Sequence, residues 1–263
     1  MPAMIRRGQG QRVSALRGKR ILSLDLPGAE EELLPGIPWG SAAAFFTPAY
    51  WKAQAWFNSV AGVGPRSHRI GTTLREEVAA CLLGGYGIPA EVGLAAFRLI
   101  RQEGLLRSKR GASREKVYQT LSGHLRVNGR TVRYRFAHQK SGYLAAALDA
   151  LDRGSPPEGS DLAFRDYFLS LPGFGPKTAS WLTRNWLGSD RVAVLDVHVI
   201  RAGVIAGVFE RRRARAQDYR EMELRFLGFA EALGVRASVL DALIWGHMRK
   251  GAGLARMLVE GSN

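Results

Sequence analysis

The sequence predicts a mostly α-helical fold, and three observations lead to this prediction. Beyond residue 72, apolar residues recur three and four positions apart over most of the chain, as they do on one face of a helix. The alternation of apolar and polar residues that marks a strand is confined to residues 125–136. The chain has 263 residues, of which 46% are apolar and 23% charged, a composition that supports a core and excludes overall disorder.

The N-terminal segment is basic and irregular. The first twenty residues contain no acidic side chain and six basic ones: Arg6, Arg7, Arg12, Arg17, Lys19 and Arg20. We expect a disordered, solvated tail here, with an arm that lies along DNA phosphates as the alternative. Prolines and glycines interrupt residues 27–38, and an aromatic-rich segment at 45–57 is expected to include a packed helix.

Helix signals follow in order from Thr72. The spacing of Val78, Cys81 and Leu82 predicts a helix that begins after Thr72 or Thr73 as N-cap and ends at Gly84. The same reasoning predicts further helices at 89–100, 113–121, 143–151, 161–171, 176–188, 197–206, 217–233 and 237–248.

A small β-hairpin is predicted at residues 125–136. Asn128-Gly129 is typical of a two-residue hairpin turn, and apolar residues alternate with polar ones on both sides of it. We expect one apolar face, with the other face carrying Arg126, Arg130, Arg133 and Arg135. That arginine face is either merely solvated or a ribbon that contacts the DNA backbone.

Charge and cysteine content limit the class of protein. The 38 Lys and Arg against 23 Asp and Glu give a net charge of +15, which favours nucleic acid as partner; an acidic membrane surface or an acidic protein would also fit. The single cysteine, Cys81, excludes an intramolecular disulfide, a Cys-based zinc site and a Cys-ligated iron–sulfur cluster. Without a signal peptide or a long apolar run, we expect a soluble intracellular protein, cytoplasmic and nucleoid-associated, and not secreted.

The chemically informative segment joins two predicted helices within residues 161–188. Its turn places Gly173 and Gly175 at alternate positions, and Pro176 opens the second helix. Glycines allow close approach of the backbone, and the free amides at a helix start form a site for phosphate. A nucleotide-binding P-loop is excluded, because that motif needs a glycine where Pro176 stands and a strand before it.

This segment resembles the helix-hairpin-helix signature of the base-excision DNA glycosylases, and within that superfamily the 8-oxoguanine glycosylase branch. The resemblance rests on the Leu-Pro-Gly-Phe-Gly-Pro hairpin, on Lys177 directly after it, and on Asp196 nineteen residues further on. It implies a two-lobed, mostly α-helical glycosylase fold. The matching region runs from residue 160 to residue 203, and the flanking helices fit less specifically.

The resemblance implies a bifunctional DNA glycosylase and AP lyase of base excision repair, which flips a damaged nucleotide out of the duplex. Lys177 would be the Schiff-base nucleophile, and its place at a helix start disfavours extra positive charge. Asp196 would be its electrostatic and proton-handling partner, and is expected also to be the N-cap of the next helix. No cofactor is implied, and the histidines show no pair at metal-site spacing, so no metal site is expected.

The resemblance also implies which residues contact DNA. Gly173, Gly175 and His198 would lie against the DNA backbone, although His198 could equally be packed between helices. The residues that probe the orphaned cytosine have no clear match, and Arg133 and Arg135 are the candidates.

Three residues are expected in the base pocket. Trp181 lies four residues after Lys177, on the same side of the helix, and would stack on one face of the flipped base. Trp245 would stack on the other face, and Asp241 would accept hydrogen bonds from the edge of a guanine-type base. Each tryptophan could instead belong to the core.

The predicted function is therefore excision of an oxidised purine, 8-oxoguanine above all, from double-stranded DNA by a monomer. The alternatives are a helix-hairpin-helix DNA-binding protein without catalysis, or the same chemistry on another modified base. We expect residues 1–70 to pack with the C-terminal lobe, 71–207 to form a helical domain, and 208–263 to complete the base pocket.

Overall fold

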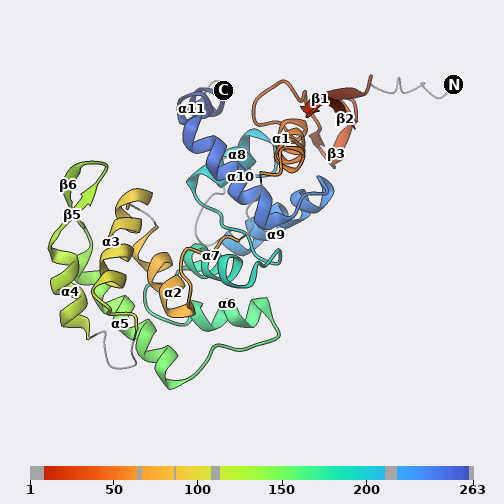
Figure 1. Cartoon of the computed structure of the whole chain (residues 1–263). Helices are drawn as coiled ribbons and strands as arrows, with labels where there is room; N and C mark the ends of the chain where they lie inside the picture. The colour runs from red at the N-terminus through yellow and green to blue at the C-terminus, as the bar shows by residue number, and fades with distance from the viewer. Residues whose placement is uncertain (1–8, 64–66, 86, 108–112, 211–217, 261–263) are drawn as a thin grey trace. The chain divides into compact units, whose positions relative to one another are not determined.

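The computed structural model describes residues 9–63, 67–85, 87–107, 113–210 and 218–260. The chain forms two compact units (Figure 1). The first consists of Met1–Arg66 together with Asp190–Asn263, and the second is the continuous segment Ser67–Ser189. The expected middle domain, 71–207, extends beyond the second unit, because residues 190–207 pack into the core of the first.

The second unit is helical apart from one hairpin. Its elements are α2 (Leu74–Leu83), α3 (Ala90–Gln102), α4 (Arg114–Ser122), β5 (His124–Val127), β6 (Arg130–Arg133), α5 (Ala137–Arg153), α6 (Asp161–Leu169) and α7 (Pro176–Leu187). Side chains cap three of the helices: Thr73 accepts from the Glu76 amide, Ser113 from Lys116, and Ser160 from Ala163. The helices predicted to begin after Thr72 or Thr73, at 113 and at 161 begin within one residue of those positions. Helix α5 begins six residues before the prediction, because residues 137–142 are too polar to show helical periodicity.

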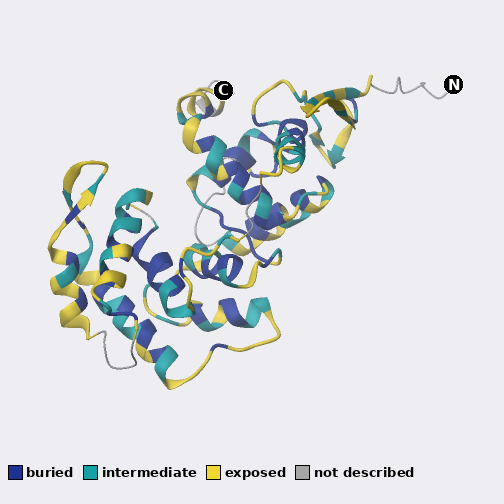
Figure 2. Ribbon diagram, viewed as in Figure 1, coloured by how far each residue is buried: buried dark blue, intermediate teal, exposed yellow. Residues whose placement is uncertain are grey.

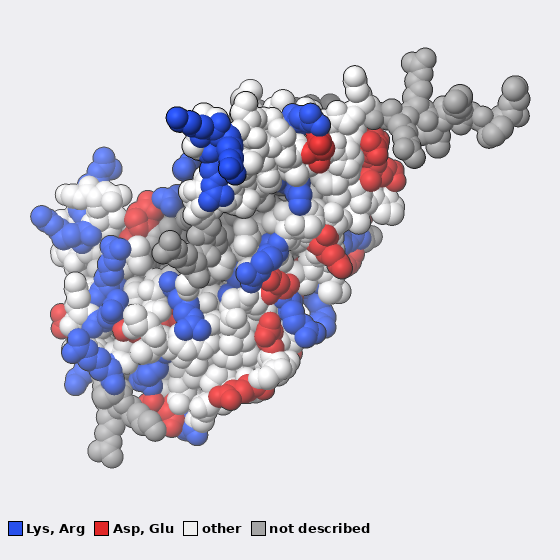
Figure 3. Space-filling model, turned by 45° about the vertical axis from the view of Figure 1, so that its right-hand side comes forward, with Lys and Arg blue, Asp and Glu red and all other residues white. Residues whose placement is uncertain are grey.

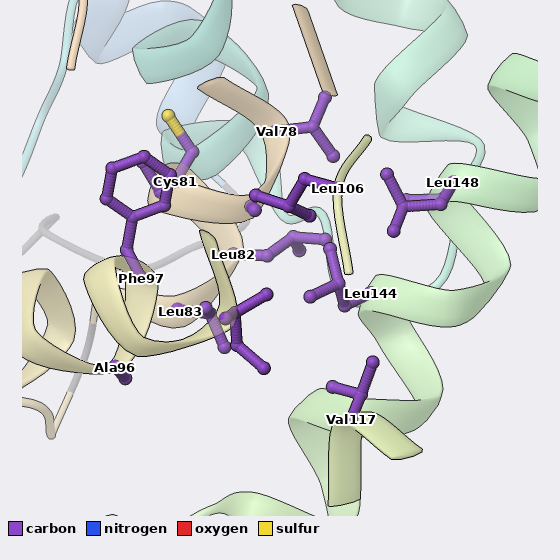
Figure 4. Close-up of a cluster of buried hydrophobic side chains, with 14 of the residues drawn as sticks. Val78, Cys81, Leu82, Leu83, Ala96, Phe97, Leu106, Val117, Leu144 and Leu148 are labelled. Carbon is purple, nitrogen blue, oxygen red and sulfur yellow. The ribbon is translucent and has the colours of Figure 1, made fainter. Parts of the chain in front are cut away.

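The core of the second unit forms around α2. Val78, Cys81, Leu82 and Leu83 are fully buried, and side chains from α3, α4 and α5 point toward them (Figure 4). Buried residues lie along the inward faces of these helices, while their outward faces are exposed (Figure 2). Helix α2 therefore fixes the positions of the helices that surround it.

The predicted hairpin is present, but its arginines do not share one face. Asn128 and Gly129 form the turn at φ +50° and +77°. Val127 lies opposite Arg130 and Leu125 opposite Val132, so Arg130 belongs to the face that carries the apolar residues. Of the strand arginines, only Arg126 and Arg133 lie on the other face, and Arg135 follows the strand. The expectation of four arginines on one face was wrong, because Arg130 has the same strand parity as Val132.

The first unit contains two short N-terminal hairpins, β1-β2 and β3-β4, together with helices from both ends of the chain. Its elements are β1 (Gln11–Arg17), β2 (Arg20–Leu26), β3 (Glu32–Leu34), β4 (Ile37–Pro38), α1 (Pro48–Val60), α8 (Val197–Ile205), α9 (Tyr219–Ala232), α10 (Ala237–Lys250) and α11 (Ala252–Glu260). The core contains buried aromatic residues of the α1 region, including Phe46 and Trp51, and Phe226 and Phe229 of α9. It joins α1 to α8, α9 and α10.

The N-terminal segment is ordered where the structure describes it. Strands β1 and β2 pair antiparallel from Gln11↔Leu26 to Arg17↔Arg20. The expectation of a disordered tail was therefore wrong for this part, because Val13 and Leu24 pack beside Ala49 and Ala53 of α1. Arg6 and Arg7 lie outside the described residues. Among the helices of the described ranges, none has the length and apolar character needed to cross a bilayer.

Candidate active site

The turn between α6 and α7 uses its two glycines differently. Gly173 has φ +88°, and a Cβ added there would lie 2.4 Å from the Tyr143 ring, so this position admits only glycine. Gly175 has an ordinary φ of −90°, is exposed, and has no heavy atom within 4 Å of where a Cβ would be. Folding therefore requires Gly173. At Gly175, the absence of a side chain leaves room for a bound molecule to approach the backbone.

The start of α7 is open to an anion. Gly175 is the N-cap residue, so no side chain caps the helix, and Pro176 occupies the first turn. Phe174 anchors the turn by packing 5.3 Å from the buried Phe168 ring. The uncapped first amides of α7 and the positive end of its dipole therefore form a site suited to an anion, and the turn holds them in place.

Lys177 and Trp181 lie on the same side of α7, as their spacing predicts. The Lys177 Nζ lies 5.6 Å from the centroid of the Trp181 ring. That ring packs against the end of α2, where its Cη2 would lie 3.1 Å from a Cβ at Gly84. Both residues are partly buried, so the ammonium group has an aromatic neighbour held in place by the backbone of α2.

A second lysine belongs to this group. Lys140, on α5, is partly buried, and its pKa is lowered first by burial and then by the positive charge of Lys177. Burial raises the pKa of the Cys81 thiol, while Lys177 acts on it in the opposite direction. Nothing in the sequence around Lys140 marked it, because its nearness to Lys177 depends on how α5 packs.

A buried carboxylate ties α7 to α2. Glu77 is fully buried, and its Oε1 accepts a hydrogen bond of 2.7 Å from Nδ2 of Asn185 on α7. Its Oε2 accepts the amides of Ile70 and Gly71, each at 2.7 Å. This network fixes the position of the helix that carries Lys177, and its one mark in the sequence is an acid on an apolar helix face.

The other predicted site residues lie in the first unit, where Asp196 begins α8. Its Oδ1 accepts the amides of His198 and Val199, both at 2.9 Å, which confirms the predicted N-cap. His198 is partly buried, and its Nδ1 is enclosed without a hydrogen-bond partner in the part of the chain that the structure describes.

Side chains of α9 and α10 hold the segment that leads into Asp196. The amide of Ala193 donates to Glu223 Oε1 at 3.0 Å, that of Val194 to Asp241 Oδ2 at 3.1 Å, and that of Leu195 to the Tyr219 hydroxyl at 3.2 Å. Glu223 and Asp241 are 3% and 1% exposed. These contacts fix the irregular backbone before Asp196, and sequence reasoning missed both Glu223 and Tyr219.

Helix α10 carries two of the predicted base-pocket residues in different surroundings. Asp241 is buried against Val194, whereas Trp245 is 37% exposed, with the Arg249 guanidinium 5.3 Å from its ring centroid. Asp190 fixes the start of α10 by accepting the Ser238 amide at 2.9 Å. Burial alone would raise the pKa of Asp190, but the hydrogen bonds from Ser238 and Arg236 outweigh it and lower the pKa.

The predicted site residues thus fall into two groups. Gly173, Gly175, Lys177 and Trp181 belong to the second unit. Asp196, His198, Asp241 and Trp245 belong to the first. Within the described ranges, His, Cys, Asp and Glu side chains do not gather in threes as a metal site would require.

Comparison with known proteins adds a family and a fold. Residues 67–235, more than half of the chain, match the family model described as 8-oxoguanine DNA glycosylase. The chain shares its fold with the 8-oxoguanine DNA glycosylase of Methanocaldococcus jannaschii, at 23% identity and a TM-score of 0.51, over 78% of this chain and 88% of that one. A second structure from that organism, a glycosylase/lyase in complex with a 15mer DNA containing 8-oxoguanine, gives 22% identity and a TM-score of 0.52, over 78% and 91%.

No curated protein sequence matches the chain significantly. The family match spans the whole helix-hairpin-helix segment together with Lys177, Trp181, Asp196 and His198. With its helical fold and its match over more than half its length, this chain belongs to the 8-oxoguanine DNA glycosylase family.

Proposed function

We propose that this chain is a bifunctional DNA glycosylase and AP lyase that removes 8-oxoguanine from double-stranded DNA as a monomer, without a cofactor. The observation that carries the proposal is the placement of Lys177. It stands in the first turn of an uncapped helix, directly after the hairpin, with its Nζ near the Trp181 ring. The family of the chain and the DNA in the related complex support the choice of substrate.

Two nearby positive fields favour the unprotonated, nucleophilic amine of Lys177, although the Trp181 ring favours its ammonium form. A lysine attacks carbon only when it is unprotonated, and a neighbouring positive charge disfavours the protonated form. The dipole of α7 supplies one such field, and Lys140 supplies a second cation close enough for the two lysines to interact.

The proposed reaction begins with the damaged nucleotide flipped out of the duplex. The lone pair of Lys177 Nζ forms a bond to the C1′ atom of the sugar, and the bond from C1′ to the base breaks with its electron pair on the base, which takes up a proton. The sugar ring then opens to a protonated Schiff base on Lys177. Loss of a C2′ proton expels the 3′ phosphate and nicks the strand.

Asp196 is proposed to stabilise positive charge on the sugar and to handle the protons of Lys177. Its Oδ1 is held by two backbone amides of α8, so the carboxylate has a fixed orientation. The side chains of Glu223, Tyr219 and Asp241 hold the segment before it. Preorganisation of this kind makes the charge of a carboxylate more effective, because no reorientation is needed during the reaction.

The remaining predicted contacts become part of the proposal. Trp181 and the exposed Trp245 would stack on the flipped base. His198 and the amides at Gly173 and Gly175 would bind the DNA backbone. Contact between Asp241 and the base edge would require a rearrangement, because its carboxylate is 1% exposed and holds Val194.

Borohydride trapping tests the proposal. The wild type and Lys177→Gln are incubated with a duplex carrying 8-oxoguanine opposite cytosine, and with the same duplex carrying an abasic site. We expect a covalent protein–DNA band with both duplexes for the wild type and none for Lys177→Gln. Lys116→Gln, at an exposed lysine of α4, is the matched control and should be trapped like the wild type.

The two duplexes separate the alternatives. Trapping on the abasic duplex alone would mean that the lyase chemistry is right and the base is another one. Tight binding without trapping or base release on either duplex would identify a DNA-binding protein without catalysis.

Two substitutions at Asp196 separate its structural role from its proposed chemical one. Asn is as good an N-cap as Asp, so Asp196→Asn should keep the free energy of unfolding, whereas Asp196→Ala should lower it by about 1 kcal/mol. Both should slow base release by about 10²-fold or more, since both remove the charge. Equal single-turnover rates for the wild type and Asp196→Asn would contradict the electrostatic role.

A further inference from the structure

The N-terminal hairpin carries an exposed apolar pair at its tip. Along the outward face of β1 and β2, Arg12 lies opposite Asp25 and Ser14 opposite Ser23, and the two serine hydroxyls lie 2.9 Å apart. At the end of this polar face the register places Leu16 opposite Ile21. These two side chains are 72% and 74% exposed, on the face that is otherwise polar.

The hairpin is anchored at its base. Leu26 is buried beside Ala49 and Ala53 of α1, with Val13 and Leu24 packed against them. Exposure increases toward the turn, and every residue from Leu16 to Ile21 is exposed. The tip is thus a ribbon held by its base, with its last apolar pair facing solvent.

The cations at the tip stand opposite one another. Arg17 is paired in register with Arg20, an arrangement of like charges that destabilises a sheet, and Lys19 lies in the turn between them. The base of the same ribbon shows the opposite arrangement, because Arg12 forms a 2.6 Å ion pair with Asp25. Within the described part of the chain, no ion pair with an acidic side chain is recorded for the three tip cations.

We propose that this tip, residues 16–21, is a DNA-contacting element additional to the helix-hairpin-helix. Arg17, Lys19 and Arg20 neutralise phosphates, while Leu16 and Ile21 pack against sugars and base edges at a groove wall. A two-stranded ribbon fits the major groove of duplex DNA, where Leu16 and Ile21 would face one side of the groove, while Arg17 and Arg20, on the opposite face of the ribbon, reach phosphates on the other side. The inference rests on the proposed function only in requiring that the chain binds duplex DNA.

Charge favours DNA over a protein partner as the occupant of the tip. The chain carries a net charge of +15, and basic side chains recur over the surface shown in Figure 3, with acidic ones interspersed. The tip itself, residues 16–21, contains three cations and no acidic residue. A partner with a regular array of anions relieves the repulsion between Arg17 and Arg20, and the DNA backbone provides such an array.

The salt dependence of binding to an undamaged duplex tests the inference. The tip variant combines Arg17→Ala, Lys19→Ala and Arg20→Ala, and affinity is measured by fluorescence anisotropy at several salt concentrations. Each lost phosphate contact lowers the magnitude of the slope of log K against log [salt] by about 0.9. The slope of the tip variant should therefore be smaller in magnitude than that of the wild type by about 2 to 3. A variant with Arg17→Lys and Arg20→Lys should keep the wild-type slope.

Two controls separate the tip from general charge. Arg98→Ala with Arg107→Ala and Lys116→Ala removes three exposed cations of the second unit and should change the slope less than the tip variant does. Arg12→Ala with Asp25→Ala removes the ion pair at the base of the ribbon without changing net charge, and should leave the slope unchanged. An equal loss of slope in the tip variant and the charge-matched variant would overturn the inference.

The apolar pair is tested separately. Leu16→Ser with Ile21→Ser should weaken duplex binding by about tenfold at an unchanged salt slope, since apolar contact is lost without charge. Unchanged thermal unfolding midpoints for these exposed positions would show that the fold is intact. If the tip variants lost binding to phosphatidylserine vesicles and bound DNA like the wild type, the occupant would be a lipid surface and the inference would fall.

Failure of the inference about the hairpin tip can be distinguished from failure of the proposed function. The anisotropy measurement uses undamaged DNA, so it does not depend on catalysis. Loss of slope in the tip variant of a protein that releases no 8-oxoguanine would support the DNA contact at the tip and refute the proposed excision of 8-oxoguanine. Release of 8-oxoguanine by a tip variant that keeps the wild-type salt slope would refute the DNA contact at the tip and support the proposed glycosylase function.

Discussion

Lys140 shows how one side chain can lower stability and assist a neighbour. Burial disfavours its ammonium form, and so does the charge of Lys177, so its pKa in the folded chain lies below the ordinary 10.5. Below that folded pKa the protein bears the full cost of a charged, partly buried lysine. The cost declines as the pH rises from the folded pKa toward 10.5, because the unfolded chain then binds more protons than the folded one.

Lys140→Met should therefore stabilise the protein at neutral pH. We expect the free energy of unfolding in urea to rise by up to about 1 kcal/mol at pH 7, a typical size for a single substitution, and the gain to shrink as the pH approaches 10.5. In the pH profile of the trapping rate on the abasic duplex, the acid limb should move to higher pH, because Lys177 loses a neighbouring positive charge. Lys116→Met, at an exposed position, is the control for both measurements, and a destabilised Lys140→Met would contradict this account.

Among the residues, the sequence could indicate those whose role depends on local geometry. Asp196 as an N-cap and the shared side of Lys177 and Trp181 both follow from positions a few residues apart along one helix. Lys140, Glu77 and Glu223 could not be found in this way, because each acts on a segment more than thirty residues away or on one brought near only by folding. Their contacts depend on the packing of whole helices.

At the scale of the element, the turn between α6 and α7 separates folding from binding. Gly173→Ala should lower the free energy of unfolding by about 2 kcal/mol or more, because it forces a Cβ into the Tyr143 ring at an unfavourable φ. Gly175→Ala should cost less, at most about 1 kcal/mol for the poorer N-cap, since a side chain there meets nothing in the protein. Its effect should appear instead in duplex binding, which we expect to weaken by about tenfold if a phosphate approaches that backbone.

Urea unfolding and anisotropy on the same two variants check this prediction. Strong binding by Gly175→Ala together with normal stability would mean that the second glycine does not face DNA.

Elements with strong local signals were predicted, and those without were not. The cap signal at Thr72 and Thr73 predicted the start of α2, and Asn128-Gly129 predicted the hairpin of β5 and β6. The N-terminal hairpin was missed because its basic residues suggested solvation, although alternation of Val13 and Ala15 with polar neighbours was present. The predicted face of Arg130 was also wrong. Which face of a strand a residue occupies follows from whether its position is odd or even along the strand, not from the composition of the segment.

At the scale of the whole molecule, the two units have separate cores. The same substitution can be made in each: Leu144 and Leu240 are both fully buried, the first in the core of the second unit and the second in that of the first. Leu→Ala at such positions costs about 2–5 kcal/mol. By hydrogen exchange, Leu144→Ala should lose protection within residues 67–189, and Leu240→Ala within the first unit. A uniform loss in either variant would show that the units unfold together.

The overall class was within reach of the sequence, and the division into units was not. Helical periodicity predicted the mostly α-helical fold that the structure shows. The segment 190–207 was expected in the middle domain because it follows the helix-hairpin-helix directly, but Val199 and Ala202 are buried in the core of the first unit. Periodicity identifies an apolar face without identifying the core that receives it.

The interrupted first unit has a consequence for synthesis on the ribosome. Residues 1–66 emerge long before 190–263, with which they share a core, while the whole of 67–189 is made in between. At about 5–20 residues per second, that interval lasts on the order of ten seconds. During it, the aromatic surface of α1 has no partner from α9 or α10 to cover it, whereas the continuous unit can already fold. The order of translation therefore places the period of greatest exposure at the beginning of the chain, and chaperone binding there would be expected before binding anywhere else.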